Sequence, residues 1–423
     1  MMLYSWLKIK FYPQNLLIIW IPIFITAFIF QIVSISRYKA NEKKPQASSL
    51  KTNSSNSISF ITIILLLVLC IFILHAFIVV LTTAPIGWDA YGIYFIKAQA
   101  FYKDGHIESL KNNTYGSAGH PNYPNLYPLI EAYLYYFIGT NNERVVSIIF
   151  PIIYSSILIL LISTLTPLIG LNLSILTSIM IASLPVTLDY FTSTTHGGYM
   201  DMPLAFTTVI GIAFGLLWLK ERKNTHFVFF SLIMGCLAWT KNEGIPISFI
   251  WLGLFTIILL VSSLNWKRKL ILLIILLVCY LSFTISWLLY RKALGITIES
   301  VRLNLKIPVL ISRFSNIKRI LGFYWNMIQS SGEFMGIWIL FLLCGIFNIK
   351  KIYKVPNVIL LIGLICWASV YLIVLLASDN PLEWQFDTSA DRLLFHLIPT
   401  IMIFIVLCIK DLWDKYIIIE QKR

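Results

Sequence analysis

Residues 58–91 read ISFITIILLLVLCIFILHAFIVVLTTAPIGWDAY, a long apolar run that ends in a Gly-Trp-Asp turn. The apolar part is long enough to cross the hydrocarbon core of a bilayer, which takes about 20 residues as a helix. An acidic side chain just beyond such a span is costly unless it has a partner or a function. The stretch therefore predicts a membrane helix followed by a functional loop that contains Asp89.

Similar apolar stretches recur along the chain, in which 58% of the 423 residues are hydrophobic and 12% are charged. They predict an all-α polytopic membrane protein with about eleven transmembrane helices. The expected spans are 16–33, 58–82, 145–168, 173–191, 202–219, 227–238, 245–262, 270–290, 334–347, 358–376 and 393–412. Only residues 411–423 follow the last span, so no soluble carboxy-terminal domain is expected.

The formal charge of +14 is spread over the ends of the spans and forms no single basic surface, which argues against a nucleic-acid partner. The positive-inside rule assigns most of these residues to the cytoplasmic side. The cytoplasmic clusters are 37–51, 220–223, 267–269, 350–354 and 410–423. The loop 291–333 is then external although it contains Arg302, Arg313 and Arg319. Either a helix is miscounted there or the loop has a use for positive charge.

The chain divides into two parts by composition. Residues 1–57 comprise a membrane helix and a polar cytoplasmic linker, and residues 58–423 form a transmembrane module with the large external loop 85–144. Loops of that length are usually functional or disordered, and the aromatic content here argues against disorder. Helical periodicity predicts two amphipathic juxtamembrane helices, 89–103 with an aromatic face and 127–138 around Glu131.

Most of the unusual polar residues fall at the predicted external ends of spans. Asp201 follows a Gly-Gly-Tyr turn and is either a simple helix cap or a site residue. Lys241 and Glu243 share a tight external turn, where they form either a solvated salt bridge or a site in which the lysine binds phosphate. Asp89 could cap the helix 89–103, but capping does not explain Trp88 and Tyr91, which are expected to build a dry wall around it.

The segment before the last span combines acids with an arginine. Arg392 has a guanidinium that matches phosphate geometry, and His396 lies one turn further along the same helix face. Arg392 could instead snorkel to the surface or pair with Asp391.

These pieces in this order resemble a known class of enzymes. They are an acid in an aromatic juxtamembrane helix, His120-Pro121-Asn122-Tyr123-Pro124, Gly198-Tyr199-Met200-Asp201-Met202-Pro203, Lys241-Asn242-Glu243-Gly244 and Asp391-Arg392-Leu393-Leu394. Their order and common membrane face resemble the GT-C membrane glycosyltransferases, over residues 85–399. Within that class the chain is similar to bacterial relatives of the protein O-mannosyltransferases (glycosyltransferase family 39) and to the lipid A aminoarabinose transferases.

The resemblance implies an inverting hexosyl- or pentosyltransferase of the bacterial plasma membrane. It would move a sugar from a polyprenyl-phosphate carrier to a lipid, glycan or protein acceptor on the external face, in contact with membrane lipids. By resemblance, Asp89 is the general base, and Lys97, Lys241 and Arg392 hold the donor phosphate. The expected substrate-binding or supporting residues are Trp88, His120, Tyr123, Glu131, His196, Tyr199, Asp201, Glu243 and Asp391.

Three alternatives remain open from the sequence. Some members of the class use a divalent metal, for which Asp89, His120, His196 and Asp201 are the candidate ligands, although their spacing follows no known ligand pattern. A lipid-linked glycan transporter would need charges along the membrane midplane, where the predicted spans are nearly free of them. A glycan polymerase or ligase with a diphosphate-linked donor would fit the external loop with Arg302, Arg313 and Arg319.

Overall fold

The computed structural model describes residue 10 and residues 59–83, 87–107, 120–192, 197–295, 303–330, 332–334, 336–349 and 353–420. Within these residues the chain is helical, and Leu303 with Ser378 forms an isolated β-bridge. The predicted amino-terminal span 16–33, most of the region 1–57, and His196 lie outside the described residues.

Seven helices are long and apolar enough to cross a membrane, and three shorter apolar helices accompany them. The long elements are α3 (Phe60–Thr82), α6 (Glu143–Val146) with α7 (Ile149–Ile169), α10 (Asp201–Glu221), α12 (Gly244–Val261), α13 (Trp266–Ala293), α17 (Val355–Ala377) and α19 (Ala390–Glu420). The shorter ones are α8 (Leu171–Ser183), α11 (Asn224–Thr240) and α16 (Ile337–Phe347). Every expected span other than 16–33 thus has a helical counterpart, and the total of about eleven stays a prediction.

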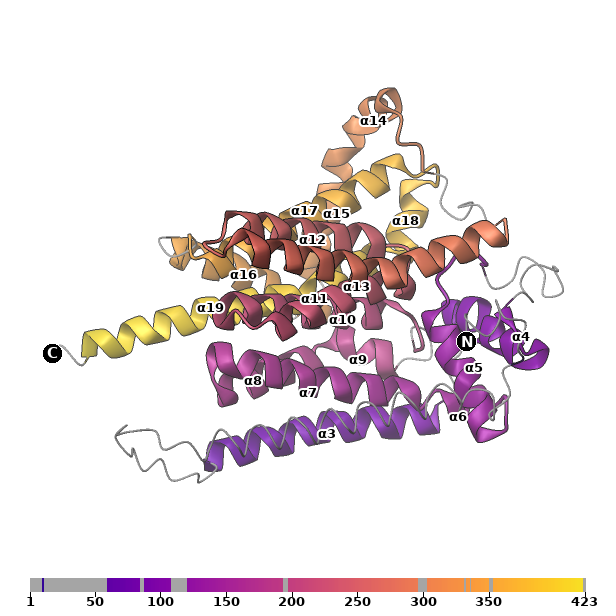
Figure 1. Ribbon diagram of the computed structural model, residues 1–423, viewed down its shortest axis with the longest axis horizontal. Helices are drawn as coiled ribbons and strands as arrows, with labels where there is room; N and C mark the ends of the chain where they lie inside the picture. The colour runs from indigo at the N-terminus through magenta and orange to yellow at the C-terminus, as the bar shows by residue number, and fades with distance from the viewer. Residues whose placement is uncertain are drawn as a thin grey trace.

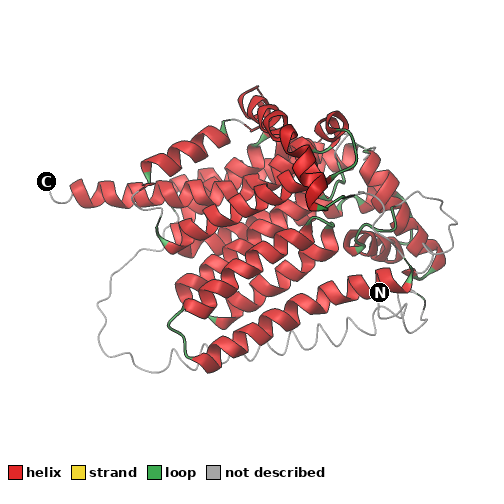
Figure 2. Cartoon of the chain, turned by 90° about the horizontal axis from the view of Figure 1, so that it is seen from above, coloured by secondary structure: helices red, strands yellow, loops and turns green. Residues whose placement is uncertain are grey.

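The helices run roughly side by side in one bundle (Figures 1 and 2). α10 and α19 are its most buried spans and pack against each other, whereas α3 lies at the edge and is mostly exposed. Residues at the edge of the bundle are large and apolar, as a lipid-facing surface requires. All six cysteines are free thiols.

One predicted helix, 173–191, is divided in the structure. It ends at Ser183, and α9 (Pro185–Thr192) begins two residues later. Proline lacks a backbone N–H and disfavours helical geometry in the residue before it, and Leu184 is accordingly extended, with φ −62° and ψ 132°.

The bundle has two chemically different ends. Lys354 pairs with Asp411 at a distance of 2.5 Å, and Arg268 donates to Asn224, at the end where α10, α12 and α16 finish. Asp89, Asp201, Lys241 and Arg392 lie at the opposite end, which we call the site end. Among the described residues, the basic side chains assigned to one side of the membrane and these four candidate site residues therefore lie at opposite ends of the bundle, as the sequence predicts.

Short helices cover the site end. They are η1 (Ala90–Phe95), α4 (Ile96–Asp104), α5 (Leu126–Ile138), α14 (Ile307–Arg313), η3 (Phe314–Asn316), α15 (Ile317–Ser330), η4 (Gly332–Phe334) and α18 (Leu382–Thr388). α14 and α15 form an arm that projects from the bundle (Figure 1). Because α13 continues to Ala293 before this arm, the basic loop 291–333 does not hide an additional span among the described residues.

The predicted helix 89–103 is present but begins as a π-helix, η1, before it continues as α4. Its aromatic face, including Tyr94 and Phe95, is buried against the bundle rather than lying in lipid headgroups. Wider π-turns occur frequently at functional sites, and this one starts directly after Asp89.

Candidate functional site

Asp89 lies immediately before η1, with its side chain directed at the last transmembrane helix. Oδ2 of Asp89 accepts a hydrogen bond from Nη1 of Arg392 at 2.6 Å, and each side chain is 16% exposed. The carboxylate makes no capping hydrogen bond to η1, so the helix-cap alternative is not what the structure contains. A charge-assisted bond at this length links residues 303 positions apart in the chain.

Asp201, the first residue of α10, is completely buried and joins three other ionisable groups. Its Oδ1 accepts from Nζ of Lys241 at 2.7 Å and lies 2.9 Å from Nε2 of His396. Its Oδ2 lies 3.6 Å from Nη1 of Arg392, which is too far for a good hydrogen bond. Asp201 therefore joins two of the three candidate phosphate ligands, Lys241 and Arg392. It is no simple helix cap, because its carboxylate contacts these side chains and His396 and makes no hydrogen bond to the backbone of α10 among the described residues.

His396 extends the network into the bundle, although no role was expected for it from the sequence. Its Nδ1 lies 2.6 Å from the hydroxyl of Tyr371 on α17, and both side chains are buried. A carboxylate can only accept hydrogen bonds, so a neutral imidazole donates from Nε2 to Asp201 and accepts from Tyr371 at Nδ1. The signal for His396 was its position one turn after Arg392, but nothing in the sequence pointed to Tyr371.

The turn after α11 holds Lys241 in place. Lys241 also lies 3.3 Å from Glu243, so both partners of this lysine are acids. Burial lowers the pKa of Lys241, but Asp201 and Glu243 outweigh that effect, and the pKa is raised above its ordinary value. A Cβ at position 244 would come within 1.9 Å of the carbonyl oxygen of Leu237, so this turn requires Gly244. Lys241 is thus a buried, doubly paired cation and not a solvated surface lysine.

A glycine also brings the Tyr199 turn against the start of η1. Gly198 has φ +87°, and a Cβ there would lie 2.9 Å from Cβ of Ala90, the residue after Asp89. The approach places the ring of Tyr199 next to the guanidinium of Arg392, with 5.4 Å between the ring centroid and Cζ. Tyr199 therefore contributes a cation–π contact to the same arginine that binds Asp89.

Aromatic side chains line the approach to the Asp89–Arg392 pair. His120 packs edge-on between Trp88 and Tyr123, with 5.6 Å between ring centroids on each side. Burial, followed by the nearby Glu243, raises the pKa of Tyr123 to about 12, so its hydroxyl stays protonated and can donate. Burial and the nearby Lys97 lower the pKa of His120, which favours the neutral imidazole at neutral pH.

Trp88 and Tyr91 do not form the dry wall that was expected around Asp89. Trp88 is 64% exposed and Tyr91 is 46% exposed, so neither shields the carboxylate. The side chains that bury Asp89 come from other segments instead, such as Arg392 and Tyr199. The expectation was wrong because neighbours in sequence on a helix point in different directions.

Lys97 and Glu131 do not join the cluster. Lys97 is 0% exposed and donates from Nζ to the carbonyl oxygen of Tyr123 at 2.8 Å, which places it where a phosphate cannot reach it without rearrangement. Glu131 is also 0% exposed, and in the part of the chain that the structure describes neither of its carboxyl oxygens has a hydrogen-bond partner. Asp391 lies in the first turn of α19, and Arg392 pairs with Asp89 rather than with it.

The metal alternative finds no support in the residues that are described, among which no group of three or more His, Cys, Asp and Glu side chains is placed to hold an ion. Asp89 and Asp201, two of the candidate ligands, are instead bridged by Arg392. A guanidinium between two carboxylates occupies the position that a cation would need.

Structural comparison relates this bundle to known proteins. It superposes on ArnT from Cupriavidus metallidurans in the apo state with a TM-score of 0.54 and 14% sequence identity, covering 85% of this chain and 63% of that one. For ArnT from the same organism bound to undecaprenyl phosphate, the TM-score is 0.51 with 13% identity, covering 82% of this chain and 60% of that one. The chain has the fold of ArnT.

The comparison confirms the predicted GT-C-like, all-helical membrane architecture. The chain spans less than two thirds of the length of either ArnT structure. No protein-family model matches the sequence, and no curated protein sequence matches it either.

Proposed function

We propose that this protein is an inverting glycosyltransferase that transfers a sugar from a polyprenyl-phosphate carrier to an acceptor on the external face of the membrane. The observation that carries the proposal is the Asp89–Arg392 pair at 2.6 Å, which places an acid and a cation at the site end of an ArnT-like bundle. An ArnT structure with this fold contains undecaprenyl phosphate, a polyprenyl monophosphate. This transfer requires at least a general base next to a cationic side chain that binds the phosphate.

In the proposed reaction, Asp89 takes the proton of an acceptor hydroxyl as the oxygen attacks the anomeric carbon. The bond from that carbon to the carrier phosphate oxygen breaks on the opposite side, and its electron pair leaves with the phosphate. Arg392 and Lys241 stabilise the negative charge that accumulates on the phosphate. Attack from the side opposite the leaving group inverts the anomeric configuration.

The pairing seen around Arg392 suggests an order of events. Arg392 and Lys241 already have acidic partners, so a phosphate must compete with Asp89 and Asp201 for them. Because Asp89 is the more exposed of the two acids, it is the one that a phosphate would replace. Replacement would release the Asp89 carboxylate to act as a base only when the carrier is bound.

Neither alternative has a specific observation in its favour. The ion pairs between described side chains lie at the ends of the bundle, and none marks a path through the midplane for a transporter. Of the three arginines that suggested a diphosphate-linked donor, Arg302 lies outside the described residues. Arg313 and Arg319 are paired with Asp379 and Glu383.

The test is transfer of radiolabelled sugar from a panel of polyprenyl-phosphate sugars to membrane extracts, with purified wild-type protein and Asp89→Asn. We expect Asp89→Asn to lose at least about a hundredfold in rate, the lower range for general-base catalysis. Asp104→Asn, on α4 outside the cluster, is the matched control and should keep wild-type activity. Transfer by Asp89→Asn at the wild-type rate would disprove the role of Asp89, and binding of the carrier without transfer would favour transport.

A further inference from the structure

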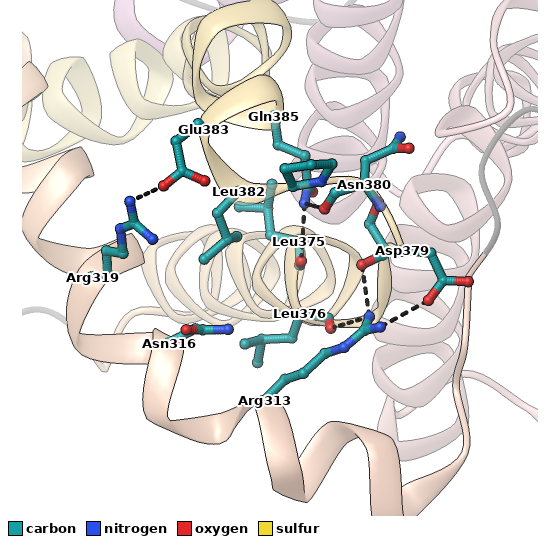
Figure 3. A pocket seen from close by; sticks show the side chains of 12 residues that line it. Arg313, Asn316, Arg319, Leu375, Leu376, Asp379, Asn380, Leu382, Glu383 and Gln385 are labelled. Carbon is teal, nitrogen blue, oxygen red and sulfur yellow. Dashed lines mark hydrogen bonds and ion pairs between the residues drawn. The ribbon is translucent and has the colours of Figure 1, made fainter.

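A polar pocket lies where the α14–α15 arm meets the turn between α17 and α18 (Figure 3). Its volume is about 270 Å³. Residues of the arm form one wall and residues 375–385 form the other, so two segments far apart in sequence enclose it. It is separate from the Asp89–Arg392 pair and shares no residue with it.

The charges that line the pocket are balanced. Nη2 of Arg313 lies 2.8 Å from Oδ1 of Asp379, and Nη1 of the same arginine donates to the carbonyl oxygen of Ser378 at 2.6 Å. Arg319 pairs with Oε1 of Glu383. The two arginines and the two acids of the lining balance, so the pocket carries no net charge that would attract an anion. The pocket therefore suits an uncharged ligand better than a phosphate or a carboxylate.

The lining side chains retain unused hydrogen-bonding capacity. The Asn316 amide has no hydrogen-bond partner among the described residues, and its side chain points into the pocket in Figure 3. Glu383 uses one carboxylate oxygen for Arg319, which leaves the other available as an acceptor. An amide and a guanidinium–carboxylate pair offer donors and acceptors side by side. A ligand with adjacent hydroxyl groups, each both donor and acceptor, complements such a surface.

Apolar groups complete the lining. Leu375, Leu376 and Leu382 lie among the polar residues and offer a surface to C–H groups. Next to them, Phe323 of the arm stacks on Phe386 of α18 with 4.0 Å between ring centroids, which holds the two walls together. The volume lies near the lower end for small-molecule pockets, about 300 Å³, which suits one ring rather than a lipid chain.

We infer that this pocket binds one uncharged sugar residue of the acceptor, so that the acceptor is a glycan. The inference rests on the proposed function, because it treats the pocket as a subsite for the molecule that receives the sugar. α18 leads from the pocket towards Arg392 and has seven residues, about 10 Å at the rise of an α-helix. A short oligosaccharide held in the pocket can therefore present a hydroxyl group at the Asp89–Arg392 pair.

Binding of neutral saccharides to the full chain in lipid nanodiscs tests the inference. The probes are hexoses, N-acetylhexosamines and their disaccharides, followed by saturation-transfer NMR and titration. We expect at least one probe to bind the wild type and to bind Asn316→Ala about tenfold more weakly, as for loss of one hydrogen bond. Lys318→Ala, an exposed neighbour outside the pocket, is the matched control and should bind normally. Failure of every probe to bind folded wild-type protein would overturn the inference.

A charge swap distinguishes a role of the Arg319–Glu383 pair in saccharide binding from a purely structural role in joining the two walls. Arg319→Glu combined with Glu383→Arg restores an ion pair but exchanges the positions of donor and acceptor. We expect the double variant to have the same thermal stability as the wild type. We expect it to bind the saccharide more weakly than the wild type does. If both the thermal stability and the saccharide affinity of the double variant equal those of the wild type, the ion pair only joins the two walls and the inference fails.

The two proposals can fail separately. Asp89→Asn should bind the saccharide like the wild type, since Asp89 does not line the pocket. If saccharide binds but no carrier-dependent transfer occurs, the transferase proposal falls and the binding site remains. If transfer occurs and Asn316→Ala leaves the KM for a glycan acceptor unchanged, the subsite falls and the transferase remains.

Discussion

Two regions at the site end bury ionisable side chains in opposite ways. Asp201 and Lys241 are buried together, with Arg392 and His396 in contact with the same carboxylate. Lys97 and Glu131 are equally buried, but neither has an oppositely charged partner among the residues with described positions. In the first region partners compensate for lost hydration, whereas in the second region burial shifts the pKa of each group towards its neutral form. A cluster of paired charges can hold and release a phosphate, but isolated buried groups contribute packing and hydrogen bonds.

The comparison predicts its largest effect at Asp201. Replacing it with alanine leaves Lys241 and Arg392 without their shared acid, and loss of one partner from a buried pair costs about 3–5 kcal/mol. Asp201→Ala should therefore lower the free energy of unfolding by about that amount in thermal or denaturant unfolding of purified protein. Asp391→Ala removes an acid that is adjacent to Arg392 in sequence but does not pair with it. It serves as the control and should change little. Equal stability of Asp201→Ala and wild type would show that Asp201 does not compensate for the burial of Lys241 and Arg392.

Arg392→Ala should mainly weaken binding of the polyprenyl-phosphate carrier. Removing a hydrogen bond to a charged group costs about 1.5–3 kcal/mol, which corresponds to a loss of affinity of roughly tenfold to a hundredfold. Affinity for a polyprenyl phosphate, measured by titration in nanodiscs, checks this. Lys103→Ala, on the last turn of α4, is the control for loss of one positive charge at the same end. Unchanged affinity in Arg392→Ala would remove Arg392 from the phosphate ligands.

Glu131→Gln tests the neutral region. Burial raises the pKa of Glu131 well above its ordinary value of 4.5, so the folded state keeps a proton that the unfolded state loses as pH rises. The wild type therefore loses stability as pH rises above 4.5, at about 1.4 kcal/mol for each unit until the folded pKa is reached. Glu131→Gln should remove this dependence and be more stable than the wild type at pH 7, with the gain absent at pH 4. Unfolding measured at both pH values checks it, and a gain of the same size at both would contradict the assignment.

Lys97→Met should have the smallest effect on function. Burial lowers the pKa of Lys97 well below its ordinary value of 10.5, so wild-type stability falls as pH drops below 10.5. The substitution removes that penalty but loses the hydrogen bond to Tyr123, which is worth about 1 kcal/mol. We expect carrier affinity to stay within about threefold of wild type, since a difference below about 1 kcal/mol changes Kd little more than that. A loss of tenfold or more would restore Lys97 as a phosphate ligand.

The sequence predicts the structure best where one physical rule acts locally. Long apolar runs identified the spans because backbone groups in a bilayer must be satisfied within a helix. The sequence also predicts one common end of the bundle for four site residues, because the alternation of spans determines the end at which each connecting segment lies. The four are Asp89, Asp201, Lys241 and Arg392. The prediction of one continuous helix over 173–191 was wrong, because the segment is apolar throughout although Pro185 interrupts the helix.

The sequence by itself determined the membrane class, most of the helices and the end of the bundle at which the chemistry is proposed. Only the tertiary structure decided that Arg392 meets Asp89, that Asp201 joins Lys241 to His396, and that Lys97 is buried away from them. The physical reason is that hydropathy and charge bias depend on composition along the chain. Pairing depends on angles between helices far apart in sequence, such as α10 and α19, and on the close approaches that Gly198 and Gly244 permit.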